Sequence, residues 1–287
     1  MPTAEHIGTV IQRALEAVKA GPPKSTPSGF PSLNRLCAGG FQAGELVYLG
    51  ARPGIGKTAM ALQMAQAAAL RGQAVLIISR EMVNVSLARR LLSQQGVDAT
   101  ELRAGTVRDW GPVMDAARAL MDLPIWFSDN ALTMQEVQAV MATVPQAVDF
   151  VIVDYLQLMR VPGVIERRHQ IEAISKALKT LAIQCQIPVL CMSSLSRPQG
   201  AKPNREPVLS DLKESSDLEH DADIVLFLHR EWDDARGTMK LEARCLVAKN
   251  RDGQVGALDL VFRPEFVSFG EQAASWEVES GPDWQDR

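Results

Sequence analysis

The chain has 287 residues, of which 46% are hydrophobic, and its formal net charge is −4 at pH 7. This length favours one large α/β domain over two small ones. The acidic balance argues against a protein coated with basic surface for duplex DNA, although a ring or groove that binds nucleic acid needs only a local basic lining.

No apolar run of about eighteen residues is present, so we expect no membrane contact. The N-terminus has no signal-peptide pattern, and the 4 cysteines form no CxxC pair. Free thiols in a reducing compartment are the simpler interpretation of such cysteines, so we expect a cytoplasmic location and no metal site built from them.

Residues 4–20 place apolar side chains at helical spacing and predict a short amphipathic helix. A linker rich in Pro, Gly and Ser follows over residues 21–29. Because a helix of this length is marginal alone, it needs a surface to pack on, either its own domain or a neighbouring subunit. We therefore divide the chain into a linker helix and linker (1–26), a main domain (27–269) and an acidic tail (270–287). The tail is expected to be disordered, with a docking peptide as the alternative.

Within the main domain, short apolar runs alternate with helical patterns. The expected strands are Leu46–Leu49, Ala74–Ser79, Ile125–Ser128, Phe150–Asp154, Pro188–Ser193, Ile224–Leu228, Leu241–Ala248 and Leu258–Phe262. The expected helices between them include Thr58–Arg71, Ser86–Gln95 and Ile171–Gln186. This alternation predicts an α/β fold with a mostly parallel sheet flanked by helices. The last strands have no helices between them, which predicts an antiparallel C-terminal extension.

The segment Tyr48–Thr58, YLGARPGIGKT, has the form of a buried strand, a tight loop and a helix start, which is the form of a phosphate-binding loop. Ala51 stands where the general pattern has Gly, and an ordinary Gly-rich turn is the alternative. Lys57 would reach the β and γ phosphates, and the Thr58 hydroxyl would bind Mg²⁺. The residues expected to bind ATP are Arg52, Pro53, Gly54, Ile55, Gly56, Lys57 and Thr58.

Two acidic residues end apolar strands. Asp154 follows Phe-Val-Ile-Val, and at the carboxyl edge of a parallel sheet it can hold Mg²⁺ beside Thr58. Glu81 follows the second expected strand and is the candidate catalytic base that activates water. The alternatives are an Asp that merely ends a strand and a solvated Glu.

Together these residues indicate a RecA-like P-loop NTPase. They resemble the RecA-type ATPase domain of the DnaB family of replicative helicases over about residues 27–269. The segments that carry the resemblance are Ala51–Thr58, Ser79–Met82, Asp154–Arg160, Asp211–Asp223 and Ala248–Gly253.

The resemblance implies a ring, of six subunits in that family, with ATP sites between subunits and with Lys249 and Arg251 acting on the neighbour's γ phosphate. It also implies single-stranded DNA in the channel, and a helicase loader or primase as a further partner. The residues matched to DNA contact are Lys213, Glu214 and Ser216. Two basic segments, Arg160–Arg168 and Arg197–Arg205, could also line the channel. A solvated hairpin tip and solvated loops are the alternatives.

The chain departs from the family pattern at three places. Lys213 and Ser216 stand where the family has Arg and Gly, and Ser194 stands where a Gln senses the γ phosphate. The family's helical N-terminal collar is absent from the sequence, which leaves a naturally short relative and a fragment both open. The leading hypothesis is therefore a ring-forming 5′–3′ DNA helicase. A DNA-stimulated ATPase without unwinding and an ATP-binding assembly module stay as alternatives.

Overall fold

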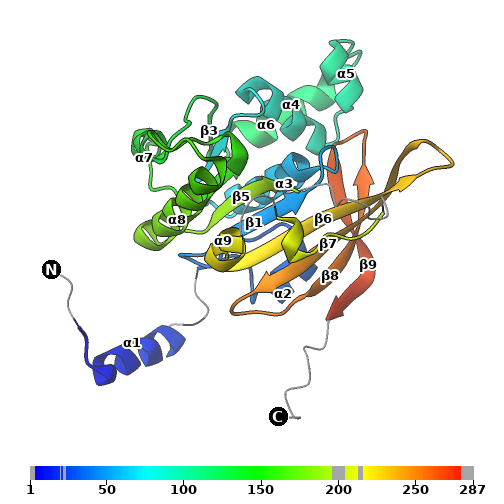
Figure 1. Ribbon diagram of the computed structural model, residues 1–287. Helices are drawn as coiled ribbons and strands as arrows, with labels where there is room; N and C mark the ends of the chain where they lie inside the picture. The colour runs from blue at the N-terminus through cyan, green and yellow to red at the C-terminus, as the bar shows by residue number, and fades with distance from the viewer. Residues whose placement is uncertain (1–3, 20, 22–23, 196–203, 213–215, 279–287) are drawn as a thin grey trace.

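The computed structural model describes residues 4–19, 21, 24–195, 204–212 and 216–278. Within these ranges the strands form one sheet in the order β3-β2-β4-β5-β1-β6-β7-β8-β9 (Figure 1). The strands are β1 Leu46–Ala51, β2 Val75–Ser79, β3 Ile125–Ser128, β4 Phe150–Asp154, β5 Val189–Ser194, β6 Ile224–Asp233, β7 Thr238–Asn250, β8 Gly256–Arg263 and β9 Ser268–Val278.

Strands β1 to β6 pair in parallel, and β6 to β9 pair antiparallel. The predicted α/β fold, with a mostly parallel sheet and an antiparallel extension, is therefore confirmed. Every residue of β1, β2 and β4 is buried, because helices cover both faces of the sheet.

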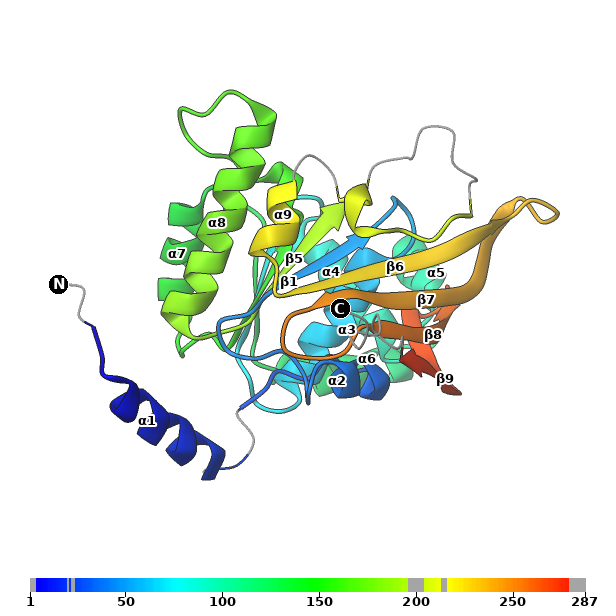
Figure 2. The same ribbon diagram turned by 60° about the horizontal axis from the view of Figure 1, so that its bottom comes forward.

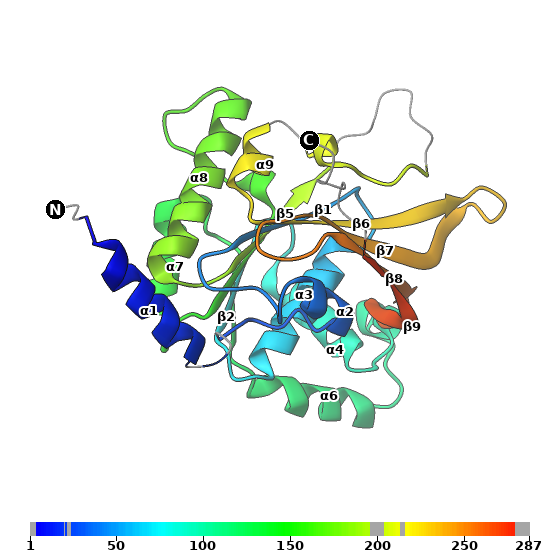
Figure 3. The same cartoon turned by 90° about the horizontal axis from the view of Figure 1, so that it is seen from below.

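The helices form two layers with the sheet between them (Figure 3). They are α2 Pro31–Leu36, α3 Lys57–Ala69, α4 Asn84–Gln94, α5 Ala99–Ala104, α6 Gly111–Met121, α7 Met134–Thr143, α8 Arg167–Cys185 and α9 Ser216–Asp221, with short 3₁₀ turns η1 Leu156–Leu158 and η2 Leu209–Asp211; the first helix, α1 Ile7–Lys19, lies outside these layers. Consecutive β1 residues point to opposite layers, so Val47 and Leu49 join the core under α3 while Leu46 and Tyr48 join the core under α8.

The ninth strand corrects one prediction. Residues 270–287 were expected to be a disordered tail, but β9 continues through Val278, and residues 279–287 lie outside the described residues. The Glu271 carboxylate accepts hydrogen bonds from the Ser32 backbone N–H and hydroxyl at 2.9 and 3.1 Å. An edge strand with polar side chains lacks the continuous apolar run that marked the central strands, so its pairing was missed.

The predicted N-terminal helix is present as α1, which lies away from the rest of the chain in Figures 1 and 2. Its apolar side chains Ile7, Val10, Ile11, Leu15 and Val18 are all exposed. Among the described residues, no helix combines the length and apolar character needed to cross a membrane.

Candidate nucleotide-binding site

The carboxyl ends of the parallel strands meet at one edge of the sheet. Ala51 of β1 pairs with Ser194 of β5, and Ser79 of β2 pairs with Asp154 of β4. The loop of residues 52–56 leaves this edge and leads into α3. The fold therefore brings the predicted phosphate loop, Asp154 and the Glu81 segment together.

Glycine is required at two positions of the phosphate loop. Gly54 and Gly56 have φ angles of 78° and 118°, a region that L side chains rarely adopt. A Cβ atom on Gly56 would lie 2.7 Å from the Phe269 ring. The Gln63 side chain donates to the Phe269 carbonyl at 2.8 Å and accepts from its N–H at 2.7 Å. The unpredicted strand β9 thus fixes the first turns of α3, whose N–H groups face the loop.

The Lys57 ammonium is held inside the site. It is 9% exposed, and its Nζ donates to the Ala51 carbonyl oxygen at 3.1 Å. Burial lowers its pKa, while the negative charges of Glu81 and Asp154 oppose that shift. Because folding has already removed most of the water around this ammonium, an anionic ligand can bind it without a further desolvation cost.

The Asp154 carboxylate has one oxygen without a partner. Its Oδ2 accepts the Thr58 hydroxyl at 3.1 Å, and its Oδ1 is buried with no hydrogen bond to any described residue. Burial raises the pKa of Asp154 from 3.8 to about 6, with the charge of Glu81 adding to the shift. An unpaired carboxylate oxygen beside a hydroxyl is the oxygen-rich donor set that Mg²⁺ prefers, so these residues fit the expected cation.

Glu81 is exposed just beyond β2, and its charge acts on both Lys57 and Asp154. Arg90 of α4 joins the same cluster. Burial lowers the pKa of its guanidinium, and the charges of Asp154 and Glu81 oppose that shift. Sequence reasoning missed Arg90, although Leu87 and Leu91 are buried at helical spacing around it, which indicates that it points inward.

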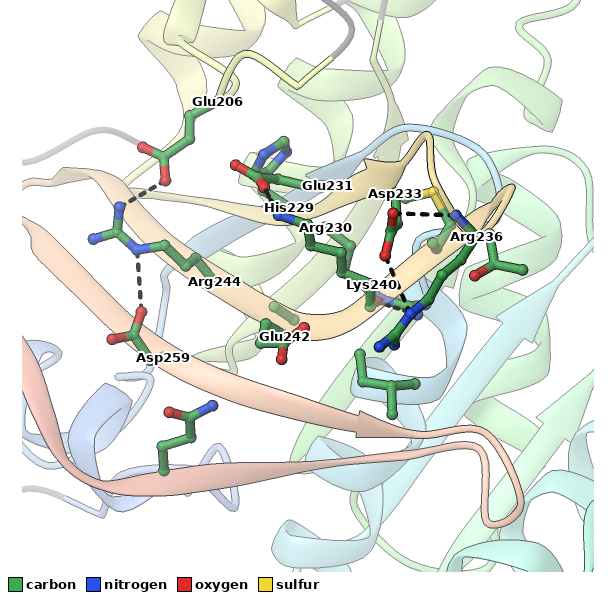
Figure 4. A pocket seen from close by; sticks show the side chains of 15 residues that line it. Glu206, His229, Arg230, Glu231, Asp233, Arg236, Lys240, Glu242, Arg244 and Asp259 are labelled. Atoms are coloured by element: carbon green, nitrogen blue, oxygen red, sulfur yellow. Dashed lines mark hydrogen bonds and ion pairs between the residues drawn. The ribbon is translucent and has the colours of Figure 1, made fainter.

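An aromatic group and a guanidinium lie beside the phosphate loop. The Phe262 ring packs 4.9 Å from that of Phe269, which covers Gly56, and Arg230 lies 4.4 Å above the Phe262 ring. Arg230 also lines a cavity of about 770 Å³ between the β6–β7 hairpin and β8–β9 (Figure 4). Neither Arg230 nor Phe262 was predicted, because only the antiparallel extension brings them to the loop.

Lys249 and Arg251 lie at the opposite edge of the sheet from Lys57. Lys249 pairs with Val225 at the start of β6, while the phosphate loop follows the far end of β1. The Lys249 ammonium donates to backbone carbonyls of Glu219 and Ala222. The Arg251 guanidinium pairs with Asp223 at 3.2 Å. One copy of the chain therefore does not bring these two residues to its own phosphate loop.

The candidate DNA residues are only partly described. Arg160 is exposed after η1, with its N–H bonded to the Leu132 carbonyl, and Ser216 begins α9. Lys213, Glu214 and Arg197 lie outside the described residues. Ser194 ends β5, where its N–H donates to Oε1 of Gln157 at 3.3 Å.

Comparison with known proteins agrees with this geometry. Residues 25–271 match the family model of the DnaB-like helicase C terminal domain. The chain is 36% identical over 253 residues to the replicative DNA helicase DnaC of Bacillus subtilis (strain 168), covering 85% of this chain and 56% of that protein. It is 35% identical over 284 residues to the replicative DNA helicase DnaB of Leifsonia xyli subsp. xyli (strain CTCB07), covering 95% of this chain and 62% of that protein. The chain thus spans little more than half the length of these relatives.

Solved structures show the same fold. The ATPase domain of G40P aligns with a TM-score of 0.84 and 29% identity over 94% of this chain and all of that domain. A DnaB-like replicative helicase, solved in a study of its interactions with primase, aligns with a TM-score of 0.80 and 30% identity over 93% of this chain and 67% of that one.

Burial of the Asp154 carboxylate should make the stability of the nucleotide-free protein depend on pH. Because the folded pKa of Asp154 lies above 3.8, ionising it opposes folding, and this cost grows as pH rises towards about 6. The shift corresponds to about 3 kcal/mol at neutral pH. Asp154→Asn keeps the acceptor for Thr58, so we expect it to stabilise the nucleotide-free protein by about 1 to 3 kcal/mol near pH 7.5.

Thermal melting across pH measures this effect. The gain should shrink as pH falls and approach zero below about pH 3, where the wild-type carboxyl is protonated in both states. Asp122→Asn, on an exposed carboxylate, serves as the matched control and should change little. An effect of Asp154→Asn that is independent of pH would contradict the assigned burial cost.

Proposed function

Since the chain belongs to the DnaB-like helicase C-terminal domain family, we propose that it is the ATP-driven motor of a ring-forming replicative DNA helicase that moves 5′ to 3′ along single-stranded DNA. The observation that carries this proposal is the convergence of Lys57, Thr58, Asp154 and Glu81 at one sheet edge. The alternatives, a DNA-stimulated ATPase without unwinding and an assembly module, have less support because the matched relatives are named replicative helicases.

In the proposed reaction, loop N–H groups and Lys57 bind the phosphates of ATP. Thr58 and Asp154 would hold Mg²⁺, which would supply positive charge to the phosphates. Glu81 orients the attacking water and accepts its proton, because it is the exposed carboxylate next to the Lys57 and Asp154 charges. Arg90 adds positive charge where the γ phosphate becomes more negative.

The purine base has a matching surface beside the loop. Arg230 and Phe262 supply the two kinds of side chain that stack on bases, a guanidinium plane and an aromatic ring, which in this structure stack on each other. We therefore assign the base to the Arg230–Phe262 side of the loop.

The position of Lys249 and Arg251 is the reason to propose a ring. These two residues are separated from their own loop by the length of β1, about 13 Å of extended strand or more. They can serve an ATP site only if it belongs to another copy of the chain. A head-to-tail arrangement of copies that closes gives a ring, and six copies are the proposed number.

DNA and further partners complete the proposal. Single-stranded DNA would run past Lys213, Glu214 and Ser216, with Arg160 and Arg197 as further phosphate contacts. The relative solved in a study of its interactions with primase supports a primase as a partner, and a helicase loader is a second candidate. The proposed location is the cytoplasm.

Hydrolysis is tested with Glu81→Gln. We expect single-stranded DNA to stimulate wild-type ATP hydrolysis, and the variant to lose at least about a hundredfold in rate because the proton acceptor is gone. Binding of Mg-ATP, followed by fluorescence of a labelled nucleotide, should persist. Glu265→Gln, in the exposed β8–β9 turn, is the control. A variant as active as wild type would remove Glu81 from the mechanism.

Sharing of the site is tested by mixing two inactive variants. Arg251→Ala keeps an intact phosphate loop, and Lys57→Ala keeps an intact Arg251, so each alone should hydrolyse ATP poorly. In mixed rings, about one quarter of the interfaces combine an intact loop with an intact Arg251, so activity should return. If the mixture stays as inactive as its components while mixed assemblies form, Arg251 does not act between copies.

The exposed face of α1 provides a test of assembly. We propose that this face packs on a neighbouring copy, because a short amphipathic helix needs an apolar partner. Leu15→Glu should raise the concentration needed for assembly by about tenfold or more, since it buries a charge at the contact. Thr9→Glu, on the opposite side of α1, should change little. Sedimentation velocity distinguishes the outcomes, and equal assembly by both variants would exclude this contact.

A further inference from the structure

Residues 219–223, where α9 ends and β6 is about to begin, surround the basic side chains at the end of β7. Helix α9 lies beside α8 (Figure 2), and the Ser175 hydroxyl of α8 donates to the Asp221 carboxylate at 2.6 Å. This hydrogen bond holds the segment against α8. The segment supplies the backbone carbonyls and the carboxylate that contact Lys249 and Arg251.

The Asp223 carboxylate is fixed by groups other than Arg251. Its side chain is only 7% exposed. Its Oδ2 accepts the Leu46 backbone N–H of β1 at 2.8 Å and also accepts from the Lys179 ammonium of α8. The Asp223 N–H donates to the Leu46 carbonyl at 2.9 Å. Because β1 and α8 hold Oδ2 from two sides, the fold itself sets the position of Oδ1.

Arg251 is held by this fixed oxygen without being used up by it. Asp223 Oδ1 accepts from the Arg251 guanidinium at 3.2 Å, and the His220 carbonyl accepts from it at 3.0 Å. The Arg251 side chain stays 51% exposed, and its other N–H groups make no hydrogen bond to any described residue. The guanidinium is therefore oriented and still has donors for a phosphate outside its own copy.

The carboxylate also acts as the counter-charge of two neighbouring cations. Burial lowers the pKa of Lys249, and the positive charge of Arg251 lowers it further. The negative charges of Glu219 and Asp223 oppose that shift. Like charges this close repel each other, so without Asp223 the Arg251 guanidinium would turn away from Lys249 into solvent.

We propose that Asp223 is a positioning residue for ATP hydrolysis, because it orients Arg251 towards the phosphate loop of the neighbouring copy. Asp223 acts through the guanidinium and does not touch nucleotide. Its loss should therefore weaken stabilisation of the transition state, lowering kcat while leaving the KM for ATP almost unchanged. This inference rests on the proposed function, since it requires that Arg251 acts between copies.

Asp223→Asn in the full chain tests this role. The amide keeps the shape and one acceptor oxygen but loses the charge that holds the guanidinium. We expect kcat for Mg-ATP to fall by about tenfold or more, because small misplacement of a catalytic group has effects of this size, and KM to stay within about twofold. Asp115→Asn is the matched control, since it removes the carboxylate from an exposed pair with Arg118 on α6 and should behave as wild type.

Mixed assemblies separate a positioning role from a structural one. Asp223→Asn impairs only the face that offers Arg251, so its phosphate loops should work beside Lys57→Ala copies, whose Arg251 is correctly held. An equal mixture should hydrolyse ATP several times faster than the mean of the two variants measured separately. A mixture of Asp223→Asn with Arg251→Ala, which impair the same face, should show no gain.

Asp223→Glu keeps the test valid if the buried amide prevents folding, which thermal melting would show. Glutamate retains the charge beside Lys179 but moves the carboxylate by one methylene, so kcat should be intermediate. The same mixture with Lys57→Ala should restore its rate.

The outcomes distinguish failure of this inference from failure of the proposed function. A folded Asp223→Asn protein with the wild-type kcat would overturn the inference. So would a slow variant that Lys57→Ala does not rescue, although Lys57→Ala does rescue Arg251→Ala, because Asp223 would then have a structural role. If Arg251→Ala and Lys57→Ala also stay inactive together, sharing of the site is contradicted and the inference with it.

Discussion

The burial of the Asp154 carboxylate is the constraint around which the site is organised. The carboxylate is 1% exposed, yet one of its oxygens has no hydrogen bond to any described residue. Such a group opposes folding, and the surrounding parallel strands hold it in place because they are buried on both faces. Lys57, Thr58 and Arg90 partly offset the charge. The site therefore forms in the folded protein, but the Asp154 oxygen without a partner favours binding of a cation, and Lys57 favours binding of an anion beside it.

The local parts of this site could be predicted from sequence. A buried strand, glycines with positive φ and a helix start are encoded within eleven consecutive residues, and Asp154 ends an unbroken apolar run. The same reasoning could not find β9, because an edge strand needs no continuous apolar run. It also missed Arg230 and Phe262, whose approach to the loop depends on antiparallel pairing far along the chain.

The register of the sheet places the phosphate loop and the basic pair Lys249 and Arg251 at opposite edges. The phosphate loop follows the carboxyl end of β1, while Lys249 and Arg251 lie where β6 begins. Sequence resemblance suggested that these basic residues act on a neighbour, and the register supplies a physical reason.

The central claim is that the ATP site is completed by a second copy of the chain. Molecular mass and the rate of Mg-ATP hydrolysis, measured on the same samples over a range of protein concentrations, test it most directly. The account predicts little hydrolysis per chain where the protein is monomeric, and a rate that rises in step with assembly. A monomer that hydrolyses ATP at the full rate would contradict it.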